Sequence, residues 1–218
     1  WLGAFGLTEP GAGTDAAMQK TVAEDKGDHW VLNGSKIFIT NAGFANVFVV
    51  FAMTDKSLGT KGISAFIVER DFPGFKVGSH EKKMGIRGSS TCELVFEDCI
   101  VPKENLLGEV GKGFKIAMTT LDGGRIGIGA QALGIAQAAI DECVKYTKER
   151  VQFGKRISQF QNTQFQLADM QAKLDGARLL IYRAAQAKQD HEPYSHLAAM
   201  GKLMASEVAS DVTRRALQ

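Results

Sequence analysis

The feature that most constrains the fold is a change in residue usage near the middle of the chain. Sixteen of the 24 glycines lie at or before residue 113, and no proline occurs between Pro102 and Pro193. Glycine-rich turns between short apolar runs are typical of β structure, whereas a long stretch without proline permits long helices. The sequence therefore predicts a β domain followed by a helical domain.

The first part contains short β-forming runs with no helical pattern between them. Asn33-Gly34 lies between the runs His29–Leu32 and Lys36–Thr40 and predicts a β-hairpin, because Asn-Gly favours a two-residue turn. A parallel doubly wound sheet would need helices between its strands, so the pattern favours a barrel or a sandwich. The further strands that we expect are Val47–Met53, Ile63–Val68, Phe75–Gly78 and Glu93–Phe96.

In the second part, small and apolar residues recur at steps of three and four. This spacing puts them on one face of a helix, and it predicts helices near 113–149, 160–190 and 194–218. Helices of this length pack most simply as an antiparallel bundle, with turns at Phe153-Gly154 and near Pro193.

The composition is that of an ordinary globular protein, with 44% hydrophobic and 23% charged residues. A net charge of +2 is too small to indicate a nucleic-acid binder. Neither the three cysteines nor the four histidines have metal-ligand spacing, so we expect no metal site and no disulfide framework. No apolar run reaches the roughly 18 residues of a membrane-spanning helix. The chain begins at Trp1 and stops at Gln218 within a helical pattern, and we expect it to be a fragment cut at both ends.

The segment Gly6–Asp15 holds the densest group of candidate ligand-binding residues. Its pattern Gly11-x-Gly13-x-x-Ala16 imitates a dinucleotide fingerprint, but that motif requires a strand before it and a helix after it, and the residues that follow are typical of a strand. The glycines would let a ligand approach the backbone, near the hydroxyls of Thr8 and Thr14. A glycine-rich loop that caps a strand is the alternative.

Three other segments each have a binding interpretation and a structural one. Phe38-Ile39-Thr40 could lie against a flat heteroaromatic ring, or it could be a core Phe beside a turn Thr. Two glycines inside Asp122-Gly123-Gly124-Arg125 cost a helix about 1 kcal/mol each, so a ligand or a tight helix crossing should compensate. Arg125 could bind phosphate or carboxylate, or pair with Asp122. The cluster Arg150-x-x-Phe153-Gly154-Lys155-Arg156 could bind phosphate, or place cations at a helix C-terminus.

Motifs in order along the whole chain support a more specific identification. They are Gly6-Leu7-Thr8-Glu9 with Gly13-Thr14-Asp15, Lys36–Asn41, Lys83–Arg87, Val101–Gly108, Arg150–Lys155 and Phe160-Gln161. Together they resemble the acyl-CoA dehydrogenases, most closely the short-chain (butyryl-CoA) branch. Met18 departs from the family pattern, which usually has Gly, Ser or Ala at that position.

The resemblance implies an α+β fold, with a middle antiparallel β-barrel domain at 1–108 and an incomplete C-terminal α-helical bundle domain at 109–218. It also implies non-covalently bound FAD and a homotetramer arranged as a dimer of dimers. The residues expected to line the FAD are Phe5, Leu7, Thr8, Gly13, Thr14, Phe38, Ile39 and Thr40. Those expected to reach the FAD of a neighbouring subunit are Arg150, Phe153 and Gln161, and Gln218 would open the segment that holds the adenine end. Those expected to contact acyl-CoA are Thr14, Asp122, Gly123, Gly124 and Arg125.

The implied reaction is α,β-dehydrogenation of a short-chain acyl-CoA thioester to the trans-2-enoyl-CoA, a step of fatty acid β-oxidation. A carboxylate removes the α-proton, the β-hydrogen leaves as hydride to the flavin, and an electron-transfer flavoprotein accepts the electrons. We expect no residue of this chain to be the catalytic base. Two branches of the family carry that Glu at the position of Gly124, and the others carry it beyond Gln218. The chain alone is therefore expected to be inactive, with Glu9 fixing its loop.

Two other functions remain open. A family member without catalysis could act as a scaffold or an acyl-CoA-binding module, and an acyl-CoA oxidase would use oxygen in place of the protein electron acceptor. The resemblance implies a bacterial cytoplasmic enzyme or, alternatively, one of the mitochondrial matrix.

Overall fold

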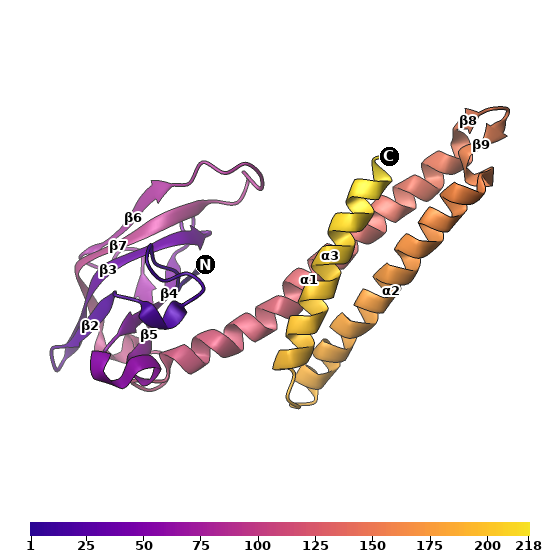
Figure 1. The fold of residues 1–218 in the computed structure, drawn as a ribbon. Helices are drawn as coiled ribbons and strands as arrows, with labels where there is room; N and C mark the ends of the chain where they lie inside the picture. The colour runs from indigo at the N-terminus through magenta and orange to yellow at the C-terminus, as the bar shows by residue number, and fades with distance from the viewer. The chain divides into compact units, whose positions relative to one another are not determined.

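The computed structural model describes all 218 residues and divides them into two compact units, Trp1–Met118 and Thr119–Gln218. The first unit is built on a β-sheet and the second is helical, so the predicted α+β class is confirmed (Figure 1). The two units meet within helix α1 (Gly113–Glu149), whose first turns belong to the sheet unit.

The first unit contains one curled seven-stranded sheet (Figure 1). Its strands are β1 (Gly3–Gly6), β2 (Val22–Asp25), β3 (His29–Thr40), β4 (Val47–Met53), β5 (Ile63–Glu69), β6 (Phe75–His80) and β7 (Thr91–Pro102). The expected antiparallel pairing holds for β2–β3, β3–β7, β4–β5 and β6–β7. It does not hold for β4 with β1 and β2, which pair in parallel. Parallel neighbours need a long connection, and the loop after β1 and the β2–β3 hairpin provide it.

The hairpin predicted at Asn33-Gly34 is wrong, because β3 runs without a break through both residues. The Asn33 side chain exchanges hydrogen bonds with Asp98, 65 residues away on β7, which holds the strand extended. A register shift marks a bulge here, and Gly34 has a φ of 141°. A Cβ at Gly34 would lie 2.6 Å from Thr21 Oγ1, so only glycine fits. The actual hairpin turn lies two residues before β3, at Gly27.

Two apolar clusters form on the sheet. The larger one contains tilted aromatic pairs: the ring centroid of Phe75 lies 4.7 Å from that of Phe48 and 5.3 Å from that of Phe96. The smaller one packs Leu7 and Phe51 against Ala117 in the first turns of α1. The sheet therefore fixes both the loop that starts at Leu7 and the N-terminal end of the long helix.

The second unit consists of the rest of α1 with α2 (Gln161–Gln189) and α3 (Ser195–Ala216), close to the predicted ranges. The turns also lie where expected: a short hairpin of β8 (Val151–Gln152) and β9 (Lys155–Arg156) follows α1, and Pro193 precedes α3. Their shared core includes Leu133 of α1, Leu174 of α2 and Val208 of α3. A Cβ at Gly129 would lie 2.3 Å from Ile181 Cδ1, so this glycine permits close helix packing.

All three cysteines are free thiols, with Cys92 and Cys99 in the sheet core and Cys143 on α1. Burial raises the pKa of the Cys99 thiol to about 12. None of the helices is both long enough and apolar enough to span a membrane.

Candidate functional site

The loop between β1 and β2 carries most of the predicted ligand-facing groups. Its first residue, Leu7, packs its side chain in the core, while Thr8 is half-buried and Thr14 is exposed. A Cβ at Gly11 or Gly13 would meet nothing within 4 Å. The protein therefore leaves open space beside the glycine backbone, where a ligand could approach.

A buried ion pair holds this loop. Lys36 of β3 is completely buried, and its Nζ lies 2.7 Å from Glu9 Oε1. The Glu9 carboxylate also accepts hydrogen bonds from the backbone N–H of Lys20 at 2.5 Å and of Thr21 at 3.0 Å. Glu9 thus joins the start of the loop to its end, as the sequence predicted when it gave Glu9 a structural role.

The pKa values of this pair follow from burial and charge. Burial by itself raises the pKa of Glu9. The Lys36 ammonium and the donated hydrogen bonds together lower it by more than burial raises it, so the net shift is downward. Burial lowers the pKa of Lys36 to about 8, although Glu9 partly offsets that effect. At neutral pH both groups are charged, and the buried carboxylate already accepts three hydrogen bonds from its own chain.

Phe38 lies at a second bulge of β3 and faces solvent. The pairing with β7 shifts register between Lys36 and Ile39, and Phe38 has a φ of 57°. A bulky residue with positive φ is a backbone outlier, and bulges commonly redirect a side chain beside a functional site. The Phe38 ring is 60% exposed, which excludes the core interpretation, whereas Ile39 is buried.

The loop and the bulge are joined directly, because the Ile37 N–H donates to the Thr8 carbonyl at 2.9 Å. The hydroxyls of Thr8, Thr14 and Thr40 make no hydrogen bond within the chain. An exposed aromatic ring beside free hydroxyls and open glycine backbone fits a planar heteroaromatic ligand with polar edges. Phe5 is half-buried, with its ring centroid 5.0 Å from that of Phe51.

The segment Asp122–Arg125 lies on α1, which continues through both glycines. Arg125 forms an ion pair with Asp122, so the structural interpretation of this pair holds. A Cβ at Gly123 would lie 2.9 Å from Lys188 Nζ, whereas one at Gly124 would meet nothing. The Lys188 ammonium is the end of a flexible side chain that can move aside, so packing requires a glycine at neither position.

The other basic cluster lies at the far end of α1. Arg150 is exposed, and its side chain forms no ion pair within the chain. Phe153 and Gly154 both have positive φ, 52° and 71°, in the β8–β9 turn, and the Phe153 ring is 92% exposed. Gln161 begins α2 and is exposed, as is Gln218 at the end of the chain.

The length of α1 separates the two candidate sites of the helical unit. Arg125 and Glu149 are 24 residues apart on one helix, which corresponds to about 36 Å along its axis. Within one chain, the Asp122–Arg125 segment and the Arg150 cluster therefore cannot both contact the same part of a small ligand.

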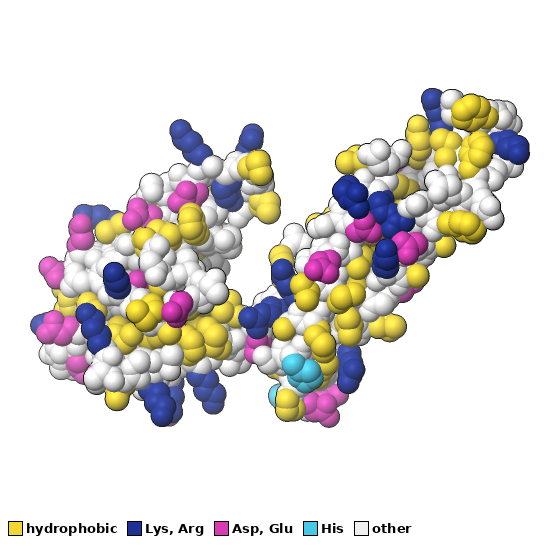
Figure 2. All heavy atoms as spheres, in the orientation of Figure 1, with side chains coloured by type: hydrophobic (Ala, Val, Ile, Leu, Met, Phe, Trp, Pro, Cys, Tyr) yellow, Lys and Arg dark blue, Asp and Glu magenta, His cyan; other side chains and the backbone are white.

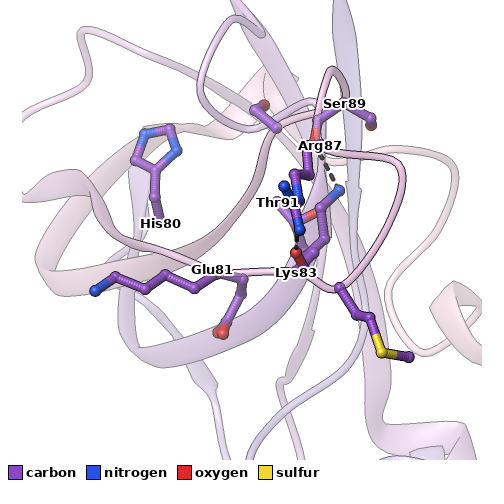
Figure 3. Close-up of a pocket in the computed structure, with 9 residues that line it drawn as sticks. His80, Glu81, Lys83, Arg87, Ser89 and Thr91 are labelled. Carbon is purple, nitrogen blue, oxygen red and sulfur yellow. Dashed lines mark hydrogen bonds between the residues drawn. The ribbon is translucent and has the colours of Figure 1, made fainter.

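A cavity of about 620 Å³ lies at the β6–β7 connection, and its lining residue Thr91 is the sheet partner of Thr40. Its lining residues are His80, Glu81, Lys82, Lys83, Met84, Arg87, Ser89, Ser90 and Thr91 (Figure 3). Lys83 Nζ donates to the Ser89 carbonyl at 2.6 Å, so this loop uses one of its cations to stabilise itself.

Sequence reasoning assigned no role to Lys36 or Gln19. A signal was present: Lys36 continues the inward-facing alternation of Trp30 and Leu32 along β3, so its side chain should point into the sheet core. The acceptors around its ammonium come from residues up to 29 positions away. No local sequence pattern indicates them.

Comparison with known families covers nearly the whole chain. Residues 4–99 match the family model described as acyl-CoA dehydrogenase, middle domain, and residues 111–218 match acyl-CoA dehydrogenase, C-terminal domain.

Individual relatives agree with this match. The short-chain specific acyl-CoA dehydrogenase of Clostridium acetobutylicum is 60% identical over 217 residues, which is 100% of this chain and 57% of that protein. Butyryl-CoA dehydrogenase from Megasphaera elsdenii has a similar solved structure, with a TM-score of 0.96, 59% identity, and coverage of 100% of this chain and 57% of that one. A structure from work on the electron transferring flavoprotein of Acidaminococcus fermentans and flavin-based electron bifurcation gives a TM-score of 0.96, 62% identity and the same coverage. The chain thus spans little more than half the length of these relatives.

Proposed function

Because this chain belongs to the acyl-CoA dehydrogenase family, we propose that it forms the flavin- and substrate-binding part of an enzyme that converts a short-chain acyl-CoA to the trans-2-enoyl-CoA. The observation that carries this proposal is the exposed Phe38 beside the free hydroxyls of Thr8 and Thr14, with the two segments joined through Ile37. In this proposal residues 1–108 contribute the flavin and acyl-CoA contacts of the β domain, and 109–218 contribute the helical domain.

FAD is the cofactor that we propose for this site. Its ring system would lie against Phe38, and the hydroxyls of Thr8, Thr14 and Thr40 would bond its edges. Leu7, Gly13 and Ile39 would contribute backbone, because the first and last have buried side chains and the glycine has none; half-buried Phe5 would flank them. Bound there, FAD would supply the hydride acceptor of the reaction.

We propose that Arg150, Phe153 and Gln161 bind the FAD of a neighbouring subunit. The roughly 36 Å between Arg125 and the end of α1 supports a second subunit as their partner. Exposed apolar side chains on the helices also favour an oligomer (Figure 2). Leu121, Ile128 and Ile135 recur every seven residues on α1 and are 37%, 50% and 52% exposed, which gives a stripe suited to helix contacts. A homotetramer would use such surfaces, and Gln218 would lie near the adenine end of the cofactor.

The acyl-CoA would contact Thr14 and the helical segment Asp122, Gly123, Gly124 and Arg125. The open space at Gly124 supports close approach of a ligand to the helix. Removal of the α-proton requires a carboxylate within about 3 Å of it. The buried contacts of Glu9 with Lys36, Lys20 and Thr21 support a structural role for this residue and another source for the base. The base would come from outside this chain.

An electron-transfer flavoprotein is the electron acceptor that we propose, since a similar structure comes from work on such a protein. A bacterial cytoplasmic location fits the bacterial relatives, and mitochondrial relatives make the matrix the alternative. An acyl-CoA oxidase and a non-catalytic scaffold or acyl-CoA-binding module have the same fold, and they are the competing functions.

The test is anaerobic titration of the whole purified protein with butyryl-CoA. We expect a yellow protein whose flavin absorbance is bleached by the substrate and restored by an electron-transfer flavoprotein. Rapid reoxidation by oxygen alone would favour an oxidase, and failure to take up FAD would refute the proposal. Residues 1–218 alone, supplied with FAD and an artificial acceptor, should not turn over butyryl-CoA; turnover that Glu9→Gln abolished would make Glu9 the base.

A further inference from the structure

Lys36 is the largest fully buried side chain of the protein, and the proposed function gives it no task. It lies in the middle of β3, two residues before the exposed Phe38. A buried ammonium loses its hydration, and its pKa falls to about 8 as a result. Replacing both members of a buried ion pair, here Lys36 and Glu9, with apolar side chains of similar volume is often neutral or stabilising. Stability alone therefore does not account for this buried pair.

The contacts of the ammonium indicate what it does instead. Its three N–H groups match three acceptors: the Leu7 carbonyl at 3.1 Å, Glu9 Oε1 at 2.7 Å and Gln19 Oε1 at 3.0 Å. A lysine has three donors, so every one is used. Leu7 and Glu9 stand at the start of the β1–β2 loop, whereas Gln19 stands at its end.

The acceptors are themselves tied to the loop backbone. Glu9 binds the N–H groups of Lys20 and Thr21, and Gln19 Nε2 donates to the Ala16 carbonyl at 3.3 Å. One ammonium thus bonds to groups at both ends of the loop that carries Thr8 and Thr14. A methionine could fill the same volume, but it could not fix the direction of any of these groups.

The strand that carries Lys36 also holds the other side of the site. The next residue, Ile37, donates its N–H to the Thr8 carbonyl, and the β3 bulge then turns Phe38 outward. The β1–β2 loop and the exposed Phe38 ring are therefore both held by the part of β3 that contains Lys36.

We propose that Lys36 is a positioning residue that sets the geometry between the β1–β2 loop and the Phe38–Thr40 segment through its bonds to Leu7, Glu9 and Gln19. The inference rests on the proposed function, because these two segments are the proposed flavin contacts. Lys36 itself does not touch the cofactor; it acts through Glu9 and Gln19.

The experiment compares Lys36→Met with Leu32→Ala in the whole protein. Leu32 is a matched control, since it is fully buried on the same strand but belongs to the apolar core cluster and lies six residues before Phe38. FAD affinity, the visible circular dichroism of the bound flavin and the urea midpoint of unfolding are measured for both variants. We expect Lys36→Met to weaken FAD binding by about tenfold or more and to change the dichroism, while Leu32→Ala lowers the urea midpoint with both flavin readouts unchanged.

Two further variants keep the test decisive if Lys36→Met folds poorly. Gln19→Leu removes one acceptor and no charge, and it should still alter the flavin dichroism. The double variant Glu9→Gln/Lys36→Met removes both charges, and it should recover part of the urea midpoint but not the flavin signature. Hydrogen exchange of the Lys20 and Thr21 amides, measured without FAD, should be faster in every variant that breaks the network.

The outcomes separate this inference from the proposed function. If the unaltered protein binds FAD and the Lys36 and Gln19 variants bind it with the same affinity and dichroism, the positioning role is refuted and the proposed function stands. If the unaltered protein does not bind FAD, the proposed function fails and this inference fails with it.

Discussion

Two regions of the molecule use charge in opposite ways. In the β unit, Lys36 and Glu9 are buried and satisfied entirely by groups of the same chain. At the tip of the helical unit, Arg150 and Lys155 are exposed and form no ion pair within the chain. Charges with every bond made inside the protein can fix its shape but cannot bind a ligand. Unpaired charges contribute little to the fold and remain free for an anion or a second subunit.

The largest expected effect is on stability, at the buried pair. Glu9→Gln leaves the Lys36 ammonium buried without a counter-charge, and this should lower the free energy of unfolding by about 3–5 kcal/mol. Urea denaturation of the whole protein measures it. The matched control is Glu24→Gln, which removes an exposed partner of Lys26 and should cost less than about 1 kcal/mol. Equal losses in the two variants would contradict the distinction between buried and exposed charge.

The same comparison depends on pH. Because folding lowers the pKa of Glu9 below its ordinary value of 4.5, the unfolded chain binds the proton first as the pH falls. The stability that the carboxylate contributes is therefore fully present above pH 4.5 and is lost as the pH falls through the lowered pKa of the folded state. The difference in unfolding free energy between the unaltered protein and Glu9→Gln should shrink below pH 4.5. A difference that stayed constant down to the acid transition would argue against an ionised Glu9.

The second effect is on binding, at the helical tip. Arg150→Gln removes a cation proposed to meet the FAD diphosphate, and a charged hydrogen bond of about 1.5–3 kcal/mol corresponds to roughly 10- to 100-fold in affinity. Its stability without FAD should change by less than about 0.5 kcal/mol. Lys148→Gln, two residues earlier and also exposed, is the control that should keep FAD. Unchanged FAD retention in Arg150→Gln would favour a simple interaction with the helix C-terminus.

A third test uses two glycines of α1. Gly129→Ala places a Cβ 2.3 Å from Ile181 Cδ1 and should destabilise the bundle by about 1–3 kcal/mol. Gly124→Ala meets nothing and should stabilise the helix by up to about 1 kcal/mol, while raising the KM for acyl-CoA in the whole enzyme. Thermal unfolding and steady-state kinetics distinguish them. If Gly124→Ala left the KM for acyl-CoA unchanged, the proposal that acyl-CoA contacts the helix at Gly124 would be refuted.

The smallest effect concerns Phe153. Its positive φ in a two-residue hairpin turn suits Asn better than an aromatic residue. Phe153→Asn should therefore raise the free energy of unfolding by up to about 1 kcal/mol and weaken FAD retention. A variant that lost stability instead would show that the contact of Phe153 with Phe160, 6.4 Å between ring centroids, outweighs the strain.

Several parts of the fold could be predicted from the sequence because their cause is local. The three helices follow from apolar and small residues at steps of three and four, and β4 from the run Val47–Met53. The order of motifs gave the family. The loop of Thr8 and Thr14 and the aromatic Phe38 were recognised as candidates for the same reason, since their residue types and neighbours are informative by themselves.

Only the tertiary structure decided the features that depend on distant partners. Asn33-Gly34 would form a turn in an isolated segment, but Asp98 and Thr21 hold it as a bulge in a continuous strand. Phe38 is aromatic next to apolar residues, yet the register against β7 turns it to solvent. Lys36 carries a charge, which predicts exposure, but Leu7, Glu9 and Gln19 together satisfy it inside the sheet. Sequence patterns report the preferences of neighbouring residues, whereas hydrogen bonds across 17 to 65 positions exist only once the chain has folded.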